Sequence, residues 1–416
     1  MGSVGSTFVA VISTIATFLL LFLALSGLFG AVNALRSPTL RGPMWTRPRW
    51  MPAMLTSELL PLRVSIHAVL VIVLITMGAL ENPLGWVALA MTIVSWIGYV
   101  FLQLRARRAK HAMEEALDAA GIDTTDFAEV EIARIALVYP YRIPKELRRV
   151  EDIEYAPGLH LDLYRSAESN EPGPVLLQIH GGSWVGGHKQ QQARPLLDRM
   201  ARRGWAAASV AYPLAPEATF PEQLIGLKRA LAWVRKEGTG HGMDPSFVAV
   251  TGGSAGGHLA ALVALTQNMA AYQPGFEDAD TSIAAAVPLY GVYDLLNRHG
   301  AREPFWDVMR RFVGADPAEE PDRFREASPL DRVNEGAPPF FVIHGSHDPL
   351  IPKLEATMFV ESLRSVSTQS VLYAEIPGAT HAFDNVHSLR THYVISGIAR
   401  FLEATRRRAA DPDAPV

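Results

Sequence analysis

The chain has 416 residues, of which 49% are apolar and 19% are charged, and its mean hydropathy is +0.12. The high apolar content and the absence of cysteine exclude an intrinsically disordered chain and a disulfide-stapled scaffold. A net charge of −4 and a pI of about 6.4 disfavour a nucleic-acid-binding protein, so we expect no nucleic-acid partner.

Much of the hydrophobicity lies in three apolar runs, at residues 7–32, 64–80 and 84–104. A bilayer hydrocarbon core about 30 Å thick needs roughly 20 helical residues, so each run is a candidate membrane span. The second run is the shortest and contains His67, which makes it the weakest candidate. Pro83 separates it from the third run and predicts a helical hairpin. We predict a transmembrane region over residues 1–104 rather than a cleaved signal peptide, because no basic residue precedes Arg36.

Basic residues gather on one side of the predicted spans. They are Arg36, Arg41, Arg47, Arg49 and Arg63 between the first and second runs, and Arg105, Arg107, Arg108 and Lys110 after the third. Cytoplasmic flanks of membrane proteins are enriched in basic residues. We therefore predict a multi-pass protein of the cell membrane with three spans, its N-terminus outside and the chain after residue 105 in the cytoplasm. This orientation requires that all three runs span.

After the third run, the sequence changes from long apolar stretches to segments that alternate between apolar and charged residues. We expect a helical connector over 105–149, a globular domain over 150–406 and a flexible charged tail over 407–416. Near-continuous apolar runs predict buried strands at 175–179, 206–211, 247–251, 284–289, 340–343 and 371–376. Helices are expected at 222–236, 257–267, 354–365 and 388–403. This alternation predicts an α/β fold with a mostly parallel, doubly wound sheet, whose ligands gather at the carboxyl ends of the strands.

A Gly-x-Ser-x-Gly motif lies at residues 252–256, where a predicted strand runs into a predicted helix. Small residues on both sides of Ser254 suit a tight turn that presents the serine Oγ at the helix N-terminus. This context is typical of a nucleophilic serine. A glycine-rich turn with a structural serine is the alternative.

A nucleophilic serine also needs hydrogen-bond donors for an oxyanion. The segment His180-Gly181-Gly182 follows a predicted strand, and consecutive glycines let backbone N–H groups converge on one point. We expect the N–H groups of Gly181, Gly182 and Ala255 to form an oxyanion hole. His180 is expected to shape this loop, and a role as a base is the alternative.

The acid and the base are expected to follow the serine along the chain. Asp348 lies after one predicted strand, with Pro349 fixing the loop, and His381 lies after the last predicted strand. We expect neutral His381 to take the Ser254 proton and Asp348 to orient its ring. The alternatives are Asp294 or Asp384 for the acid and His387 for the base.

Metal and nucleotide chemistry receive no support from the motifs. The chain has thirteen histidines, but it has no H-E-x-x-H motif and no cysteine. It also lacks the lysine-containing motif of a P-loop. We therefore expect no metal and no cofactor.

Residues 150–403 resemble the α/β-hydrolase fold, in its hormone-sensitive-lipase-like and related carboxylesterase branch. The matching segments, in family order, are 180–184, 212–217, 244–257 and 327–352, followed by His381. Because apolar runs precede them, the chain also resembles membrane-anchored bacterial lipases and esterases, including actinobacterial ones.

Two positions depart from this family. Ser183 stands where a third glycine is common, which is similar to an HGG-x-W subgroup that hydrolyses small esters and amides. Gly253 stands where an aspartate often precedes the nucleophile, so a supporting hydrogen bond is expected to be missing. The resemblance also places part of the acyl pocket in 291–326. The residues expected to contact substrate are Trp184, Tyr293, Phe305 and Trp306, and a core-facing helix is the alternative for the aromatic stretch that includes Met309 and Phe312.

The resemblance implies a membrane-anchored serine carboxylesterase or lipase that hydrolyses a lipophilic ester through an acyl-enzyme, with the lipid bilayer as a further partner. One alternative is an acyltransferase that uses Ser254, Asp348 and His381 with a lipid or alcohol acceptor, and product analysis with acceptor lipids would separate the two. The other is a non-catalytic membrane scaffold, which an inert Ser254 would favour.

Overall fold

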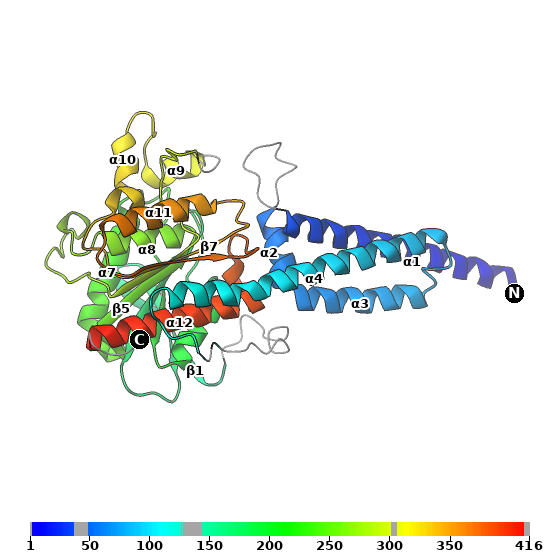
Figure 1. Ribbon diagram of the computed structural model, residues 1–416, viewed down its shortest axis with the longest axis horizontal. Coiled ribbons are helices and arrows are strands. Elements are labelled where there is room, and N and C mark those ends of the chain that lie inside the picture. The colour runs from blue at the N-terminus through cyan, green and yellow to red at the C-terminus, as the bar shows by residue number, and fades with distance from the viewer. Residues whose placement is uncertain (1, 37–48, 126, 128–143, 301–305, 412–416) are drawn as a thin grey trace.

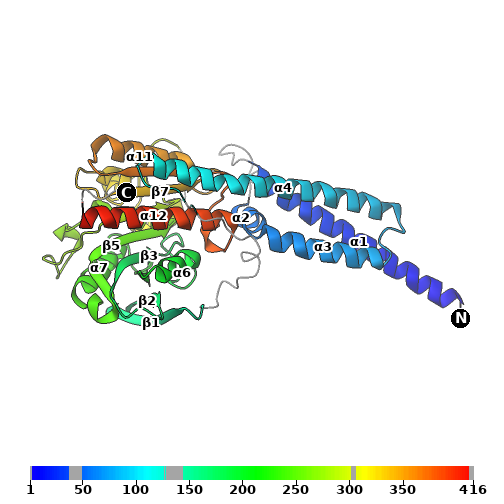
Figure 2. The same ribbon diagram turned by 60° about the horizontal axis from the view of Figure 1, so that its bottom comes forward.

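The computed structural model describes residues 2–36, 49–125, 127, 144–300 and 306–411. An elongated helical region lies at one end of the molecule and an α/β domain lies at the other (Figure 1). The described chain starts at the tip of the helical region that is remote from the α/β domain, and both views place its last helix on that domain (Figures 1 and 2).

The helices of the helical region are α1 Gly2–Leu35, α2 Trp50–Glu58, α3 Leu60–Thr76 and α4 Pro83–Asp118. Within the described residues, α1 and α4 each contain a stretch long and apolar enough to cross a membrane. A third candidate arises if α2 and α3, which are bent by 81°, count as one span. The expected span at 64–80 is displaced, because α3 ends at Thr76 and Gly78, with φ of +88°, closes a turn.

Helix α4 joins the expected third span at 84–104 to the start of the expected helical connector. Pro83–Asp118 is one continuous helix of 36 residues, which is about 54 Å long. Neither glycine nor proline interrupts it near Leu104, so the change from apolar to charged residues marks a change of surroundings and not of backbone. Its last turns are buried in the core of the α/β domain through Ala109, Met113 and Leu117. Residues 126 and 128–143 of the expected connector lie outside the described residues.

The α/β domain contains an eight-stranded sheet with the order β1-β2-β4-β3-β5-β6-β7-β8. The strands are β1 Leu147–Ala156, β2 Leu159–Ser166, β3 Gly173–Ile179, β4 Ala206–Val210, β5 Met243–Gly253, β6 Ala285–Leu289, β7 Phe340–Gly345 and β8 Val371–Ile376. β1 pairs antiparallel with β2, and β2 with β4, while the pairs from β4 to β8 are parallel. The predicted fold class and all six predicted strands are confirmed. β1 and β2 were not predicted, because β1 at the sheet edge is mostly exposed and carries charged residues.

Helices cover both faces of this sheet (Figure 2). One face packs on α7 Glu222–Glu237, α8 Ala255–Leu265 and α11 Lys353–Val366. The other packs on α6 Arg194–Arg202, α12 Leu389–Ala410 and the end of α4. Helices α9 Trp306–Val313 and α10 Pro321–Glu326 follow β6. Because α12 continues to Ala410, residues 407–410 of the expected tail are helical, and 412–416 lie outside the described residues.

Candidate active site

Ser254 lies on the turn between β5 and α8. Its backbone has φ of +59° and ψ of −122°, a conformation that is strained for a residue with a side chain. A Cβ added to Gly256 would lie 2.0 Å from the carbonyl oxygen of Ile179, so the turn leaves no room for a larger residue there. Strand and helix therefore meet as the motif predicts, with the serine side chain at the start of α8.

Three side chains from three strand ends form one hydrogen-bonded chain. His381 Nε2 lies 2.9 Å from Ser254 Oγ, and His381 Nδ1 lies 2.7 Å from Asp348 Oδ2. The carboxylate of Asp348 is buried and its Oδ1 accepts from the N–H groups of Leu350 and Ile351 at 2.8 and 2.9 Å. With Nδ1–H donating to this carboxylate, Nε2 is left to accept the hydroxyl proton of Ser254.

The alternative acids and base have other partners. Asp294 accepts from Arg298, and Asp384 accepts from the hydroxyl of Tyr290. His387 Nδ1 lies 3.3 Å from His392 Nε2. In the described part of the chain, no group of three or more His, Asp or Glu side chains is arranged to hold a metal ion.

Tyr290 is a residue of the site that sequence reasoning missed. Its ring lies edge-on to His381, with centroids 4.9 Å apart, and its hydroxyl donates to Asp384. A Cβ added to Gly253 would lie 2.5 Å from the Tyr290 hydroxyl oxygen, so Tyr290 occupies the space beside the nucleophile that the departure from aspartate leaves open. Burial and the neighbouring Asp384 raise the pKa of Tyr290 well above its ordinary value, so this group is a neutral hydrogen-bond donor. In the sequence, only the position of Tyr290 directly after the predicted strand that became β6 could have indicated that it belongs to the site.

His180 begins the expected oxyanion loop and is buried within it. Its ring stacks on Tyr212 with centroids 4.4 Å apart, and the Tyr212 hydroxyl donates to the carbonyl oxygen of His180 at 2.9 Å. Burial lowers the pKa of His180 to about 4, which keeps the ring neutral near pH 7. The His180 ring contacts Tyr212 and makes no hydrogen bond to Ser254. This geometry favours a loop-shaping role for His180 over a role as a base.

The expected oxyanion donors are in different situations. Gly181 lies beside the nucleophile, since a Cβ added to it would lie 3.2 Å from Ser254 Cβ. Its N–H, however, donates to Gln192 Oε1 at 2.7 Å. Gly182, with φ of +129°, donates its N–H to no acceptor among the described residues. Ala255 is in the first turn of α8, where N–H groups have no partner within the helix. Sequence reasoning therefore missed Gln192, which lies eleven residues after Gly181 and occupies its N–H.

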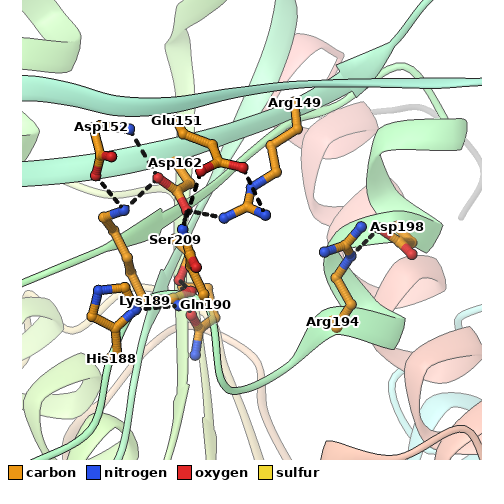
Figure 3. A network of polar contacts seen from close by, with 11 residues as sticks. Arg149, Glu151, Asp152, Asp162, His188, Lys189, Gln190, Arg194, Asp198 and Ser209 are labelled. Atoms are coloured by element: carbon orange, nitrogen blue, oxygen red, sulfur yellow. Dashed lines mark hydrogen bonds and ion pairs between the residues drawn. The ribbon is translucent and has the colours of Figure 1, made fainter. Parts of the chain in front are cut away.

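A buried polar network fixes the far end of the same loop (Figure 3). Lys189 donates to Asp162 and Asp152, at 2.5 and 2.7 Å, and Arg149 approaches Asp162 from the other side. Burial by itself would raise the pKa of Asp162, but hydrogen bonds from Lys189 and Arg149 hold the pKa below its ordinary value. The carbonyl oxygen of Lys189 also accepts from Ser209 on β4. The loop is therefore held between the first strands of the sheet and the nucleophile.

The residues expected to contact substrate lie mainly in the core. Trp184 is 3% exposed, stacks on Phe312 and donates through Nε1 to His258 at 3.1 Å. Tyr293 is 1% exposed and stacks on Phe359, which fits the core-facing alternative. Trp306 is partly buried against the same core, and Phe305 lies outside the described residues. Met309 and Phe312 of α9 are fully buried, so their side of this helix faces the core.

Comparisons with known proteins add an independent view. The family model described as BD-FAE matches residues 161–363. The chain is 38% identical over 362 residues to the "Probable carboxylic ester hydrolase LipM" of Mycobacterium tuberculosis, which covers 82% of this chain and 84% of that protein. It is 41% identical over 316 residues to "Esterase LipQ" of the same organism, with coverage of 71% and 75%. The solved structure of esterase B from Lactobacillus rhamnosis superposes with a TM-score of 0.55 at 22% identity, covering 73% of this chain and 99% of that one, which shows a shared fold.

Proposed function

The chain belongs to the hormone-sensitive-lipase-like esterases of the α/β-hydrolase fold and is a carboxylic ester hydrolase, and from this premise we propose that Ser254, His381 and Asp348 carry out the hydrolysis. The observation that carries the proposal is the continuous hydrogen-bonded chain from Ser254 Oγ through His381 to the buried Asp348 carboxylate.

The first half of the reaction forms an acyl-enzyme. His381 Nε2 takes the proton of Ser254 as Oγ attacks the ester carbonyl carbon, and Asp348 stabilises the imidazolium that results. The N–H groups of Gly182 and Ala255 donate to the oxyanion, and Gly181 adds a third donor only when its bond to Gln192 is exchanged. As the intermediate collapses, protonated His381 returns the proton to the departing alcohol.

The second half restores the enzyme. A water molecule takes the place of the alcohol, His381 removes its proton, and the resulting hydroxide attacks the acyl carbon. Collapse of the second tetrahedral intermediate releases the carboxylic acid and returns the proton to Ser254 Oγ. Each step uses residues of this chain and water alone.

We also propose that α1, α4 and the bent α2–α3 pair hold the enzyme in a membrane, with the α/β domain on the cytoplasmic side. Support comes from the length and apolar character of these helices and from the basic residues that flank them at the end nearest the domain. A lipophilic ester is then the expected substrate. Protease treatment of sealed, right-side-out spheroplasts should leave the domain intact, and digestion from outside would contradict the cytoplasmic placement.

The catalytic assignment is tested by Ser254→Ala. This variant should lose hydrolysis of nitrophenyl esters and labelling by a fluorophosphonate, while Ser365→Ala, at an exposed position on α11, should keep both. Retained labelling in Ser254→Ala would overturn the assignment.

A further inference from the structure

Helix α2 lies at the junction of the helical region and the α/β domain (Figures 1 and 2). Polar contacts hold it at both ends. At its start, the backbone N–H and carbonyl of Arg49 are both hydrogen-bonded to the side chain of Asn33 on α1, at 2.9 and 3.0 Å. At its end, the fully buried carboxylate of Glu58 pairs with Arg390 on α12 and accepts from Ser388. Polar contacts therefore join the start of α2 to α1 and its end to the α/β domain.

Between these two attachments, α2 places a tryptophan on His381. The rings of Trp50 and His381 lie edge to face, with centroids 6.0 Å apart and planes at 81°. Both ring nitrogens of His381 are used within the domain, by Ser254 and Asp348, and the buried Tyr290 packs on its ring as well. Trp50 is half-buried and reaches the histidine from the helical region, where it helps to reduce the exposure of His381 to 5%.

The role of His381 in the reaction indicates which part of the ester lies beside Trp50. In the proposed function, on which this inference rests, protonated His381 delivers its proton to the oxygen of the leaving alcohol. The alcohol part of the ester must therefore lie next to the histidine, whereas the carbonyl oxygen points toward Gly182 and Ala255. A side chain that covers His381 from outside the domain is placed beside the alcohol and not beside the acyl chain.

We propose that Trp50 forms a wall of the alcohol-binding part of the active site, and that α2 thereby selects esters with large apolar alcohols. The surface around it suits such a group, because Met51 and Leu55 of α2 are 50% and 41% exposed. Beyond the 81° bend, Leu62 of α3 is also exposed, at 45%. An alcohol with a long hydrocarbon part, as in a membrane lipid, would lie along this surface. The helical region thus contributes a substrate contact in addition to holding the enzyme in place.

Two ester series on the full-length, detergent-solubilised protein test this proposal. One series keeps the acyl group as butyrate and varies the alcohol from methyl to hexyl to naphthyl, and the other keeps nitrophenol and varies the acyl chain. Trp50→Ala should lower kcat/KM for the naphthyl and hexyl esters by about tenfold relative to the methyl ester. It should leave the dependence on acyl length parallel to wild type. Trp50→Phe should restore part of the preference.

Deacylation supplies a second readout, since all butyrates share one acyl-enzyme from which the alcohol has departed. In Trp50→Ala this rate should change far less than the acylation rates of the naphthyl and hexyl esters, because no alcohol is bound during deacylation. The matched control is Trp86→Ala, an exposed tryptophan at the opposite end of the helical region in α4, which should change neither series. A loss in Trp50→Ala that is equal for all alcohols, or that follows acyl length, would overturn the proposal.

A third variant tests the same position by adding an aromatic group back to the folded protein. The chain has no cysteine, so Trp50→Cys introduces a single thiol. Modification of the folded variant by benzyl methanethiosulfonate should restore discrimination among the alcohols, while fluorophosphonate labelling of Ser254 persists. Unchanged discrimination after complete modification would contradict a wall at this position. Activity remaining in Ser254→Ala would instead refute the proposed function, so the two failures are distinguishable.

Discussion

The α/β domain and the helical region distribute the same kinds of side chain in opposite ways. In the domain, large apolar side chains such as Phe340 and Phe359 are fully buried. Within its described residues the exposed large apolar side chains are Val150, Met269, Leu354 and Val366. In the helical region they are numerous and include Phe8, Phe18, Phe22, Phe29, Ile72, Val94, Ile97 and Phe101. The apolar surface of one region faces inward, and that of the other faces outward.

The polar groups of the helical region show the complementary pattern. Buried hydroxyls on α1 and α4 donate to carbonyls of their own helices, as in Thr17 to Ser13 and Thr92 to Ala88. The guanidinium of Arg63 turns inward and donates to the Tyr99 hydroxyl at 2.8 Å. Helices packed through small and polar residues with apolar residues outside are suited to lipid, where each backbone and side-chain polar group needs an internal partner. The difference between the regions is what we expect if lipid surrounds the helical region and water surrounds the domain, as proposed above.

The largest loss of activity is expected when the oxygen of Asp348 that accepts from His381 is replaced. Asp348→Asn keeps the shape of the side chain but replaces the acceptor facing His381 Nδ1, so the histidine loses its proper tautomer. By analogy with the corresponding change in serine proteases, kcat should fall by about 10⁴-fold. Steady-state kinetics with nitrophenyl butyrate measure this loss. Asp294→Asn, at one of the alternative acids, is the comparison, and a larger loss there would transfer the role of the acid to Asp294.

The next effect is expected at the junction between the regions. Glu58→Ala leaves the guanidinium of Arg390 buried without its carboxylate partner, and removing one member of a buried ion pair costs about 3–5 kcal/mol. Thermal unfolding of the detergent-solubilised protein should show a clear loss of stability. Replacing both residues, as in Glu58→Leu with Arg390→Met, should recover much of that loss. An unchanged Tm in Glu58→Ala would mean that α2 is not docked on α12.

A matched pair of arginine substitutions compares the two outer surfaces directly. Phe22 on α1 is 72% exposed and Leu354 on α11 is 45% exposed. If the surface around Phe22 faces lipid, Phe22→Arg should disfavour membrane insertion by roughly 3 kcal/mol. Leu354→Arg, facing water, should change stability by no more than about 0.5 kcal/mol. Membrane fractionation after carbonate washing measures the first, and thermal unfolding the second. Full retention of Phe22→Arg in the membrane fraction would contradict a lipid-facing surface at that position.

The same comparison explains what could be predicted from sequence. Apolar runs and the Gly-x-Ser-x-Gly turn are local signals, so the central strands and the conformation at Ser254 followed from short stretches of chain. The order of Ser254, Asp348 and His381 brought them forward as candidates, and the structure places them in contact, while their chemical roles stay predictions.

What sequence reasoning missed depends on contacts between distant residues. The ion pair of Glu58 and Arg390 joins residues 332 positions apart, and no local pattern indicates that α2 lies against His381. Gln192 reaches Gly181 only because the loop folds back on itself. The continuity of α4 across residue 105 was also not foreseen, because the change in hydropathy there carries no information about the backbone.

The smallest expected effect concerns a buried histidine behind the oxyanion loop. His258 Nδ1 accepts from Trp184 Nε1, and its Nε2 lies 2.7 Å from the carbonyl oxygen of Ala327, so the folded state needs the neutral ring. Burial lowers its pKa to about 4, below its ordinary value of about 6.5. As pH falls from 6.5 toward 4, the unfolded chain binds a proton that the folded chain does not, and stability declines, by about 1 kcal/mol at pH 5.5.

Thermal unfolding between pH 7 and pH 5 tests this expectation. His258→Gln keeps one donor and one acceptor and does not titrate, so the decline should be shallower in this variant than in wild type. His180, whose pKa is also lowered to about 4, should account for part of the decline that remains. An equally steep decline in His258→Gln would show that protonation at another site governs the acid sensitivity of the domain.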